Sequence, residues 1–238
     1  MVKKIGIIFA DEMEYLPFEQ YATPLGAVKT TKRSNESLVL NVKKGDREIE
    51  IHAVKCGIGK VNSASAASFL ISDDNVSAVL NAGLSGGVKG VRREDFVAGS
   101  SYVECDFDLT ALGLPIGQKP GQDYIYNADE TLLRLVLMSD GIHSGRLGTG
   151  DLFLTDKDKK DLFDGLFDLT AFDMETAAIA SVCHKADIPF VSVRKISDDA
   201  DNEGAEAYRE MNERAESSLT EVLASVIDRM FDEESYWG

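Results

Sequence analysis

The chain has 238 residues, 44% of them hydrophobic, and its 41 acidic against 25 basic residues give a formal net charge of −16 at pH 7. The length suffices for one large domain with a substantial core. The negative charge argues against nucleic acid as a partner, and no apolar run reaches membrane-spanning length. We therefore expect a small-molecule ligand, neutral or cationic, and neither a nucleic-acid nor a membrane partner.

The cysteine and histidine positions give no sign of disulfides or metal ligation. Three widely spaced cysteines stand at positions 56, 105 and 183, which favours free thiols in a reducing compartment and so a cytoplasmic protein. The three histidines, at 52, 143 and 184, lack the spacing of metal ligands, so we expect no metal and no cofactor. The start, MVKKIGIIFADEME, lacks a small-residue cleavage site and is interpreted as a first strand rather than a signal peptide.

The first half of the chain alternates apolar runs with helical patterns. Residues 4–10 predict a buried strand, and a short helix follows within 11–21, perturbed or delayed by Pro17. Alternating apolar residues on both sides of Gly45 and Asp46 predict a hairpin within 36–57. A small-residue helix is expected at 60–72 and a buried strand at 77–83. The hairpin means that the sheet is mixed rather than purely parallel.

The second half continues the alternation. We expect strands at 96–109, 166–172 and 189–197, and helices at 129–139 and 176–186. Apolar residues at helical spacing from 205 to 231, including Ala215, predict a helical stripe facing the core. No Pro-, Gly- or Ser-rich linker divides the chain. The pattern predicts a three-layer α/β/α fold with a mixed central sheet, as a single domain of residues 1–238.

Acidic or glycine-rich segments follow four of the predicted strands. Glu12 and Glu14 follow the first strand, and GLSGG, with Ser85 and Gly86, follows the strand at 77–83. The strand near 170 leads to Asp173 and Glu175, and the last strand leads to Ser197, Asp198 and Asp199. If these strands are parallel, their carboxyl ends share one edge of the sheet, which predicts one common pocket.

Each of these features alone also has a structural explanation. Acids cap helices, GLSGG suits a tight turn, and residues 198–201 suit a solvated loop. Together, several carboxylates around one neutral pocket suit the cleavage of a glycosidic bond, whose transition state is electron-poor and needs an acid and a base. Glu12 and Glu14 would repel a phosphate, although GLSGG could hold an anion through its N–H groups.

Six segments, in this order, carry a resemblance to a known family: KIGIIFADEMEY, KCGIGKVNSASAA, LNAGLSGG, DFDLTALG with GQKPG, GTGDLFL, and FDMETAAIASVCHKADIPFVSVRKISDDAD. The chain resembles the 5′-methylthioadenosine/S-adenosylhomocysteine nucleosidases of the nucleoside phosphorylase superfamily over nearly its whole length. The resemblance implies a nucleoside phosphorylase-like fold, hydrolytic release of adenine from 5′-substituted adenosines, and a homodimer.

The resemblance also implies roles for single residues. Glu14 would activate the attacking water, Asp198 would protonate the purine at N7, and Arg194 would help to hold the water and its base. Glu175 would accept hydrogen bonds from the ribose hydroxyls, with Met174 packed near the sugar. Asp173 is expected to be structural and to fix the turn that presents Glu175.

Further residues are expected to bind the substrate. Phe153 would stack on adenine, and the backbone of Leu154 would read its Watson–Crick edge. Ser85, Gly86 and Ser197 complete the substrate-binding set. The thioether end would lie against Ile58 and against residues of a neighbouring subunit, namely Leu109, Leu112, Leu114 and Pro120.

Three positions depart from the family pattern. Leu84 stands where a serine usually helps to bind the water, so either Ser85 compensates or hydrolysis is weakened. Asp11 replaces a commonly apolar residue near the alkylthio group, and Lys195 replaces a small residue beside the arginine. Both could face solvent. If Asp11 instead lies in the pocket, it would alter the preference at the 5′ position. Two alternatives stay open: a phosphate-dependent nucleoside phosphorylase, and a catalytically weak nucleoside-binding homologue.

Overall fold

The computed structural model describes residues 2–201, 204–214 and 217–237 of the chain. Its strands are β1 (Val2–Phe9), β2 (Val28–Lys32), β3 (Asn35–Lys44), β4 (Arg47–Lys55), β5 (Ala78–Gly87), β6 (Phe96–Glu104), β7 (Ile125–Asn127), β8 (Ile142–Thr149), β9 (Ala171–Asp173) and β10 (Phe190–Asp198). Its α-helices are α1 (Glu12–Ala22), α2 (Lys60–Ser72), α3 (Glu130–Leu137), α4 (Lys157–Phe167), α5 (Thr176–Lys185), α6 (Gly204–Arg214), α7 (Ser218–Asp232) and α8 (Glu234–Trp237). Short 3₁₀ turns, η1 and η2, cover Thr23–Leu25 and Thr110–Leu112.

The strands form one mixed sheet in the order β10-β6-β8-β9-β5-β1-β4-β3-β2, with β7 paired to β6. Strands β1, β5 and β10 run parallel to one another, and β4 is parallel to β1. The pairs β10–β6, β5–β9 and β3–β4 are antiparallel. Because β10 also pairs with β5, one half of the sheet closes on itself. The predicted fold class, α/β with a mixed central sheet, is confirmed.

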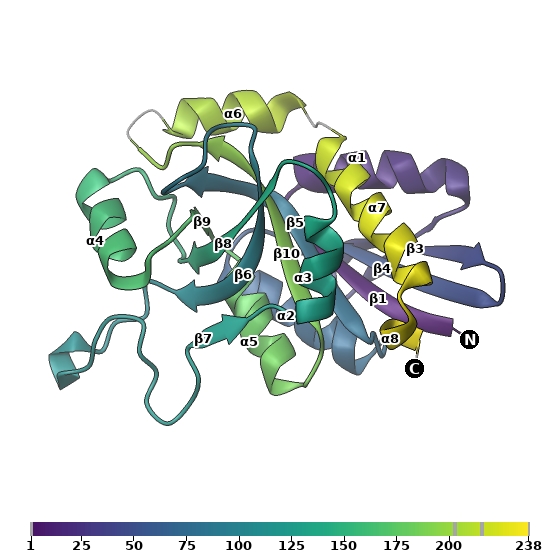
Figure 1. Cartoon of the computed structure of the whole chain (residues 1–238), viewed down its shortest axis with the longest axis horizontal. Coiled ribbons are helices and arrows are strands. Elements are labelled where there is room, and N and C mark those ends of the chain that lie inside the picture. Colours follow the sequence, from purple (N-terminus) through teal and green to yellow (C-terminus); the bar gives the residue numbers. More distant parts are fainter. Residues whose placement is uncertain (1, 202–203, 215–216, 238) are drawn as a thin grey trace.

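Helices cover both faces of the sheet and make three layers (Figure 1). Helices α2 and α5 pack against each other on one face, where α2 also contacts β1 and α5 contacts β6 and β8. On the other face, α6 packs on β10, α7 contacts β5 and β10, and α1 contacts both α6 and α7. The arrangement leaves the carboxyl ends of β1, β5 and β10 next to α1 and α6.

Several predicted elements are confirmed and some are wrong. The hairpin turns at Gly45, which has a φ of +61°, and the helix predicted at 60–72 has these bounds. Pro17 does not delay or interrupt α1: the helix starts at Glu12 and continues past Pro17 to Ala22. Asp11 nucleates the helix as its N-cap, and Pro17 is buried, so the capped first turn and packing outweigh the one backbone hydrogen bond that proline removes.

Two segments near the predicted site differ from expectation. GLSGG is not a turn after the strand, because β5 continues through it to Gly87. The segment LFDLTAF is mostly not a strand: α4 ends at Phe167 and β9 comprises only residues 171–173. Phe163 and Phe167 are buried on one side of α4, and this helical spacing decides against the strand that the aromatic and β-branched content suggested.

Strands β2, β7 and β8 and helix α4 were not among the predicted elements. The apolar stripe at 205–231 belongs to two helices, α6 and α7, with Met211, Leu223, Val226 and Met230 buried. Ala215, predicted as part of that stripe, lies outside the described residues.

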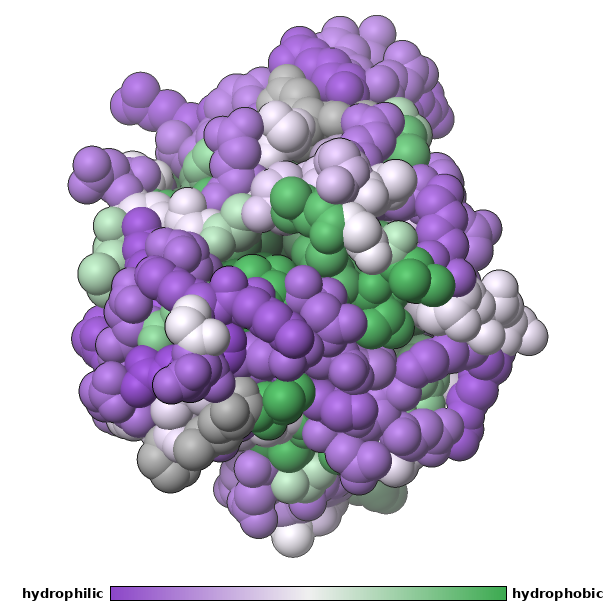
Figure 2. Space-filling view, turned by 90° about the vertical axis from the view of Figure 1, so that its right-hand side faces the viewer, coloured by the Kyte–Doolittle hydropathy of each residue, from purple (hydrophilic) through white to green (hydrophobic). Residues whose placement is uncertain are grey.

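The cysteines lie in the core, and the surface is largely hydrophilic on the face that Figure 2 shows. The cysteines Cys56, Cys105 and Cys183 are buried free thiols. In the described residues, no helix is long and apolar enough to span a membrane. The face at the right of Figure 1 has a largely hydrophilic rim, with apolar side chains gathered near its centre (Figure 2).

Candidate active site

A cavity of about 650 Å³, including its open mouth, lies at the carboxyl ends of β1, β5 and β10. Its lining brings together these sequence-predicted residues: Glu14, Ile58, Ser85, Gly86, Phe153, Leu154, Met174, Glu175, Arg194, Ser197 and Asp198. Leu109, Leu112, Leu114 and Pro120 do not line it; they lie in the segment between β6 and β7, where Leu112 is 75% exposed.

Glu14 is held by the start of α1 and by β5. Its Oε2 accepts hydrogen bonds from the backbone N–H groups of Ala10 (2.9 Å) and Asp11 (3.4 Å), which completes a capping box with Asp11. Its Oε1 accepts from the N–H of Leu84 at 2.7 Å. Burial raises the pKa of Glu14 to about 7, although the charge of Arg194 partly opposes the rise. A carboxylate with this pKa suits a general base near neutral pH.

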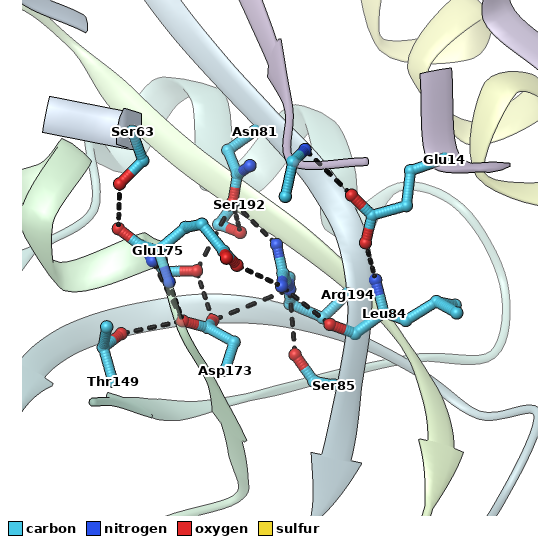
Figure 3. Close-up of polar contacts among 12 residues, drawn as sticks. Glu14, Ser63, Asn81, Leu84, Ser85, Thr149, Asp173, Glu175, Ser192 and Arg194 are labelled. Carbon is cyan, nitrogen blue, oxygen red and sulfur yellow. Dashed lines mark hydrogen bonds and ion pairs between the residues drawn. The ribbon is translucent and has the colours of Figure 1, made fainter. Parts of the chain in front are cut away.

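Arg194 is the centre of the buried polar network (Figure 3). The side chain is 1% exposed. Its Nη1 donates to Asn81 Oδ1 (3.0 Å), its Nε donates to Ser85 Oγ (2.8 Å), and its Nη2 donates to Leu84 O (2.7 Å) and Glu175 Oε2 (3.4 Å). These contacts fix the guanidinium between the ends of β5 and the acids that follow β9, so a buried charge is both paired and hydrogen-bonded.

Asp173, the last residue of β9, and Glu175, the residue before α5, make different contacts. Asp173 Oδ1 accepts hydrogen bonds from the N–H groups of Glu175 (3.0 Å) and Thr176 (2.9 Å) and from Thr149 Oγ1 (2.8 Å). Its predicted role, fixing the turn that presents Glu175, is thereby confirmed. Glu175 Oε1 accepts from the N–H of Gly59 at 2.9 Å, and the residue is 3% exposed on the cavity wall.

Asp198 ends β10, lines the cavity and is 2% exposed. Its Oδ1 accepts from the N–H of Ala200 at 2.8 Å, and its Oδ2 lies 2.7 Å from Ser197 Oγ. Burial raises the pKa of Asp198, and the hydrogen bonds from Ser197 and Ala200 oppose this only in part. A carboxyl group in this setting keeps a proton more readily than one in water, as a general acid requires.

The three departures from the family pattern lie in three different settings. Leu84 lines the cavity, and its polar contacts, to Glu14 and Arg194, are made by its backbone. Asp11 lines the cavity, so the expectation that it simply faces solvent is wrong. Lys195 is 4% exposed and points away from the cavity toward Glu94, with Nζ and Oε2 2.7 Å apart.

Two positions that the sequence interpretation did not single out support the site. Asn81 Oδ1 accepts from Arg194 Nη1 and from Ser192 Oγ (2.8 Å), while its Nδ2 donates to Ile8 O (2.9 Å). Gly83 leaves room for the base: a Cβ there would stand 2.5 Å from Glu14 Oε1 and 2.8 Å from Arg194 Nη1. A polar residue inside an apolar strand, as in LNAG, was the available signal for Asn81.

Metal ligation has no support in the part of the chain that the structure describes, where no group of three or more His, Cys, Asp or Glu stands within reach of one ion. The charged side chains of the cavity are its carboxylates and Arg194.

The chain is similar to nucleosidases in sequence and structure. Residues 4–228 match the family model of the phosphorylase superfamily. A 5′-methylthioadenosine/S-adenosylhomocysteine nucleosidase of Exiguobacterium is 34% identical over 190 residues, covering 76% of this chain and 82% of that protein. The structure of a putative nucleosidase of the same name from Francisella philomiragia matches with a TM-score of 0.89 at 28% identity, covering 95% of this chain and 99% of the other.

A second solved structure holds a ligand. The S-adenosylhomocysteine nucleosidase of Streptococcus pyogenes, in complex with 5-methylthiotubericidin, matches with a TM-score of 0.85 at 28% identity, covering 96% of this chain and 98% of the other. The sequence match and the structural matches agree, and the latter cover 95% and 96% of this chain. The chain belongs to the phosphorylase superfamily and, within it, to the 5′-methylthioadenosine/S-adenosylhomocysteine nucleosidase family.

Proposed function

We propose that this chain hydrolyses the N-glycosidic bond of 5′-substituted adenosines, among them 5′-methylthioadenosine and S-adenosylhomocysteine, and releases adenine. The observation that carries the proposal is the cavity in which Glu14 and Asp198, two carboxyl groups with raised pKa values, lie together with the buried pair of Arg194 and Glu175. An acid and a base in one site are what glycosidic hydrolysis needs.

The reaction assigns each group one task. Glu14 takes a proton from water, whose oxygen forms a bond to C1′ of the ribose. The C1′–N9 bond breaks, its electron pair goes to the purine, and Asp198 gives its proton to N7, so that neutral adenine leaves. Glu175, fixed by Arg194 and the N–H of Gly59, accepts hydrogen bonds from the ribose hydroxyls and stabilises the positive charge that develops on the sugar.

The charge of the cavity favours water over phosphate as the nucleophile. Among the described residues of the lining, Arg194 is the one cation, and it is already paired with Asp173 and Glu175. The acids of the lining are Asp11, Glu14, Asp173, Glu175 and Asp198. A phosphate dianion would enter a site of its own charge sign, which disfavours the phosphorylase alternative.

The nucleoside-binding alternative depends on Leu84, which offers no hydroxyl to the water. Ser85 Oγ accepts from Arg194 Nε, so the hydrogen of this hydroxyl remains available to another acceptor. Ser85 also lines the cavity. This position supports compensation by Ser85 and therefore catalysis rather than binding alone.

Several expectations remain proposals. The chain acts as a homodimer, in which Leu109, Leu112, Leu114 and Pro120 complete the neighbouring subunit's pocket. It acts in the cytoplasm, as a single domain of residues 1–238. The exposed Leu112 supports the dimer, because a large apolar side chain in contact with water marks a surface suited to a partner.

Release of adenine from 5′-methylthioadenosine by the purified chain in phosphate-free buffer tests the proposal. Glu14→Gln should lower the rate by roughly 10²–10⁴-fold, the usual contribution of a general base. Glu12→Gln is the matched control, since Glu12 is exposed and pairs with Lys55 outside the cavity; it should keep the rate within about twofold. An unchanged rate in Glu14→Gln would refute the assignment.

A further inference from the structure

One wall of the cavity, made by Asp11 before α1 and Tyr208 of α6, has no task in the reaction above. The Tyr208 hydroxyl donates a hydrogen bond to Asp11 Oδ2 at 3.1 Å, and Asn212 Nδ2 donates to the same oxygen at 3.1 Å. The Tyr208 ring packs edge-on against Phe153, with the centroids 5.4 Å apart. The two side chains are therefore fixed in position at the cavity.

This wall offers hydrogen-bond acceptors to a ligand. The other oxygen of Asp11 accepts from the N–H groups of Met13 (2.8 Å) and Glu14 (3.1 Å), so in the described part of the chain every hydrogen bond to Asp11 comes from a neutral donor. A phenol has one hydrogen and two lone pairs. Because the hydrogen of Tyr208 is directed to Asp11, its oxygen can only accept from a ligand.

The protonation state of Tyr208 keeps its hydroxyl a donor to Asp11. Burial raises the pKa of Tyr208, and the negative charges of Asp11 and Glu14 add to the rise. The phenol consequently keeps its hydrogen at neutral pH and continues to donate to Asp11. The wall is thus an acceptor next to a carboxylate whose charge no ion pair within the described residues neutralises.

The part of the substrate that this wall would face follows from the proposed function, on which the inference rests. In the proposed reaction, Asp198 protonates adenine, Glu14 activates the water and Glu175 binds the ribose hydroxyls. Ser85 is hydrogen-bonded to Arg194, and Ser197 is hydrogen-bonded to Asp198. Asp173 is bonded to the turn before α5, and Arg194 is bonded to Asn81, Leu84 and Glu175. Of the polar side chains in the described lining, Asp11 and Tyr208 then remain. The part of the nucleoside without a polar contact so far is the 5′ group.

We propose that Asp11 and Tyr208 determine specificity at the 5′ position: they favour 5′ groups that donate a hydrogen bond or carry positive charge, such as hydroxyl and ammonium, over thioethers. A thioether sulfur has no hydrogen to give. When it displaces water from this wall, the Tyr208 oxygen loses a partner and the Asp11 charge loses solvation without compensation. Thioether nucleosides remain substrates, with a lower kcat/KM.

A purely structural role makes a different prediction. If the Asp11–Tyr208 contact only fastens α6 to α1, its loss changes all substrates by one factor and leaves their ratio unchanged. The ratio of kcat/KM between substrates that differ only at the 5′ position is therefore the informative quantity.

The experiment measures adenine release from adenosine, 5′-amino-5′-deoxyadenosine and 5′-methylthioadenosine. In the unmodified chain, kcat/KM for the hydroxyl and amino compounds should exceed that for the methylthio compound by about tenfold, the value of one good hydrogen bond. Tyr208→Phe removes the accepting oxygen and keeps the ring, so the ratio should fall toward one. Tyr21→Phe, at a half-exposed position on α1 outside the cavity, is the matched control and should keep the ratio.

Asp11→Ser is the second variant, because serine preserves the N-cap of α1 while removing the charge. It should lower the preference for the amino compound more than that for the hydroxyl compound. A methylthio preference in the unmodified chain, or a ratio that Tyr208→Phe and Asp11→Ser leave unchanged, overturns this inference and leaves the proposed function in place. Absence of adenine from all three nucleosides overturns the proposed function as well.

Discussion

Glu14 has a structural role and a proposed catalytic role, which usually fall to different residues. It closes the capping box of α1 through the N–H groups of Ala10 and Asp11, and it stands in the cavity as the proposed base. The capping interpretation of the acids after β1 is confirmed for Glu14, and the catalytic interpretation stays a proposal for the same side chain. The sequence motif could identify Glu14 but not its pKa, which depends on burial by residues far away in the chain.

The pKa of Glu14, raised to about 7, predicts a pH dependence. The base must be ionised, so kcat/KM for adenine release should rise with pH as Glu14 ionises, through about pH 7. It should fall again where Asp198, the proposed acid, loses its proton. Measuring kcat/KM for adenine release as a function of pH checks this. If the profile showed no inflection near neutrality, Glu14 would not be the group that limits the reaction.

The same raised pKa predicts a cost in stability. Folding favours the protonated form of Glu14, so its contribution to stability is fully present below the unfolded pKa and is lost as pH rises through about 7. Glutamine stays neutral but has one acceptor oxygen where Glu14 uses two, and that loss is the same at both pH values. Between pH 5 and pH 8 the unmodified chain should therefore lose a few degrees of unfolding temperature relative to Glu14→Gln, since 1 kcal/mol corresponds to about 2–4 °C at this size. Thermal unfolding at the two pH values measures it.

At the scale of the elements, the end of β5 shows what local sequence could not indicate. GLSGG has the composition of a turn, yet β5 continues through it because β10 pairs with it over Arg194–Asp198. The glycines are required by close approach: a Cβ at Gly86 would lie 2.9 Å from Asp198 Oδ1. Pairing between distant segments overrode the local signal at this position.

Gly83→Ala should strongly impair catalysis. The added Cβ would stand 2.5 Å from Glu14 Oε1, so the carboxylate must move from its place beside Leu84 N–H. We expect adenine release to fall by roughly 10²-fold or more, because small displacements of catalytic groups have effects of this size. Gly165→Ala, on α4, is the matched control: nothing lies within 4 Å of its Cβ, and alanine favours the helix. Full activity in Gly83→Ala would show that the position of Glu14 is not critical.

At the scale of the whole molecule, the α/β class and the common pocket could be predicted from the alternation of apolar runs and from acids at strand ends. The closure of β10 onto β5 could not, because it depends on pairing between segments about a hundred residues apart. Asn81 and Ser192 stand out as polar residues in apolar strands, but the partners that they find in the network around Arg194 could not be predicted, because those partners come from other strands. The single-domain boundary stays a prediction.

The homodimer is the prediction that belongs to the complete molecule. Leu112→Asp should weaken association and lower activity together, because a charge placed in an apolar contact loses its hydration. Sedimentation velocity and adenine release check the two effects. Leu25→Asp, at another exposed leucine, is the control. A monomeric unmodified chain with full activity would contradict the shared pocket.

The central claim is that water, and not phosphate, attacks the ribose. The most direct measurement follows adenine release from 5′-methylthioadenosine over a series of phosphate concentrations, starting from none, and identifies the sugar product. We predict adenine release at a rate independent of phosphate, with free 5-methylthioribose as the product. Release that requires phosphate and yields the sugar 1-phosphate would contradict the hydrolytic mechanism.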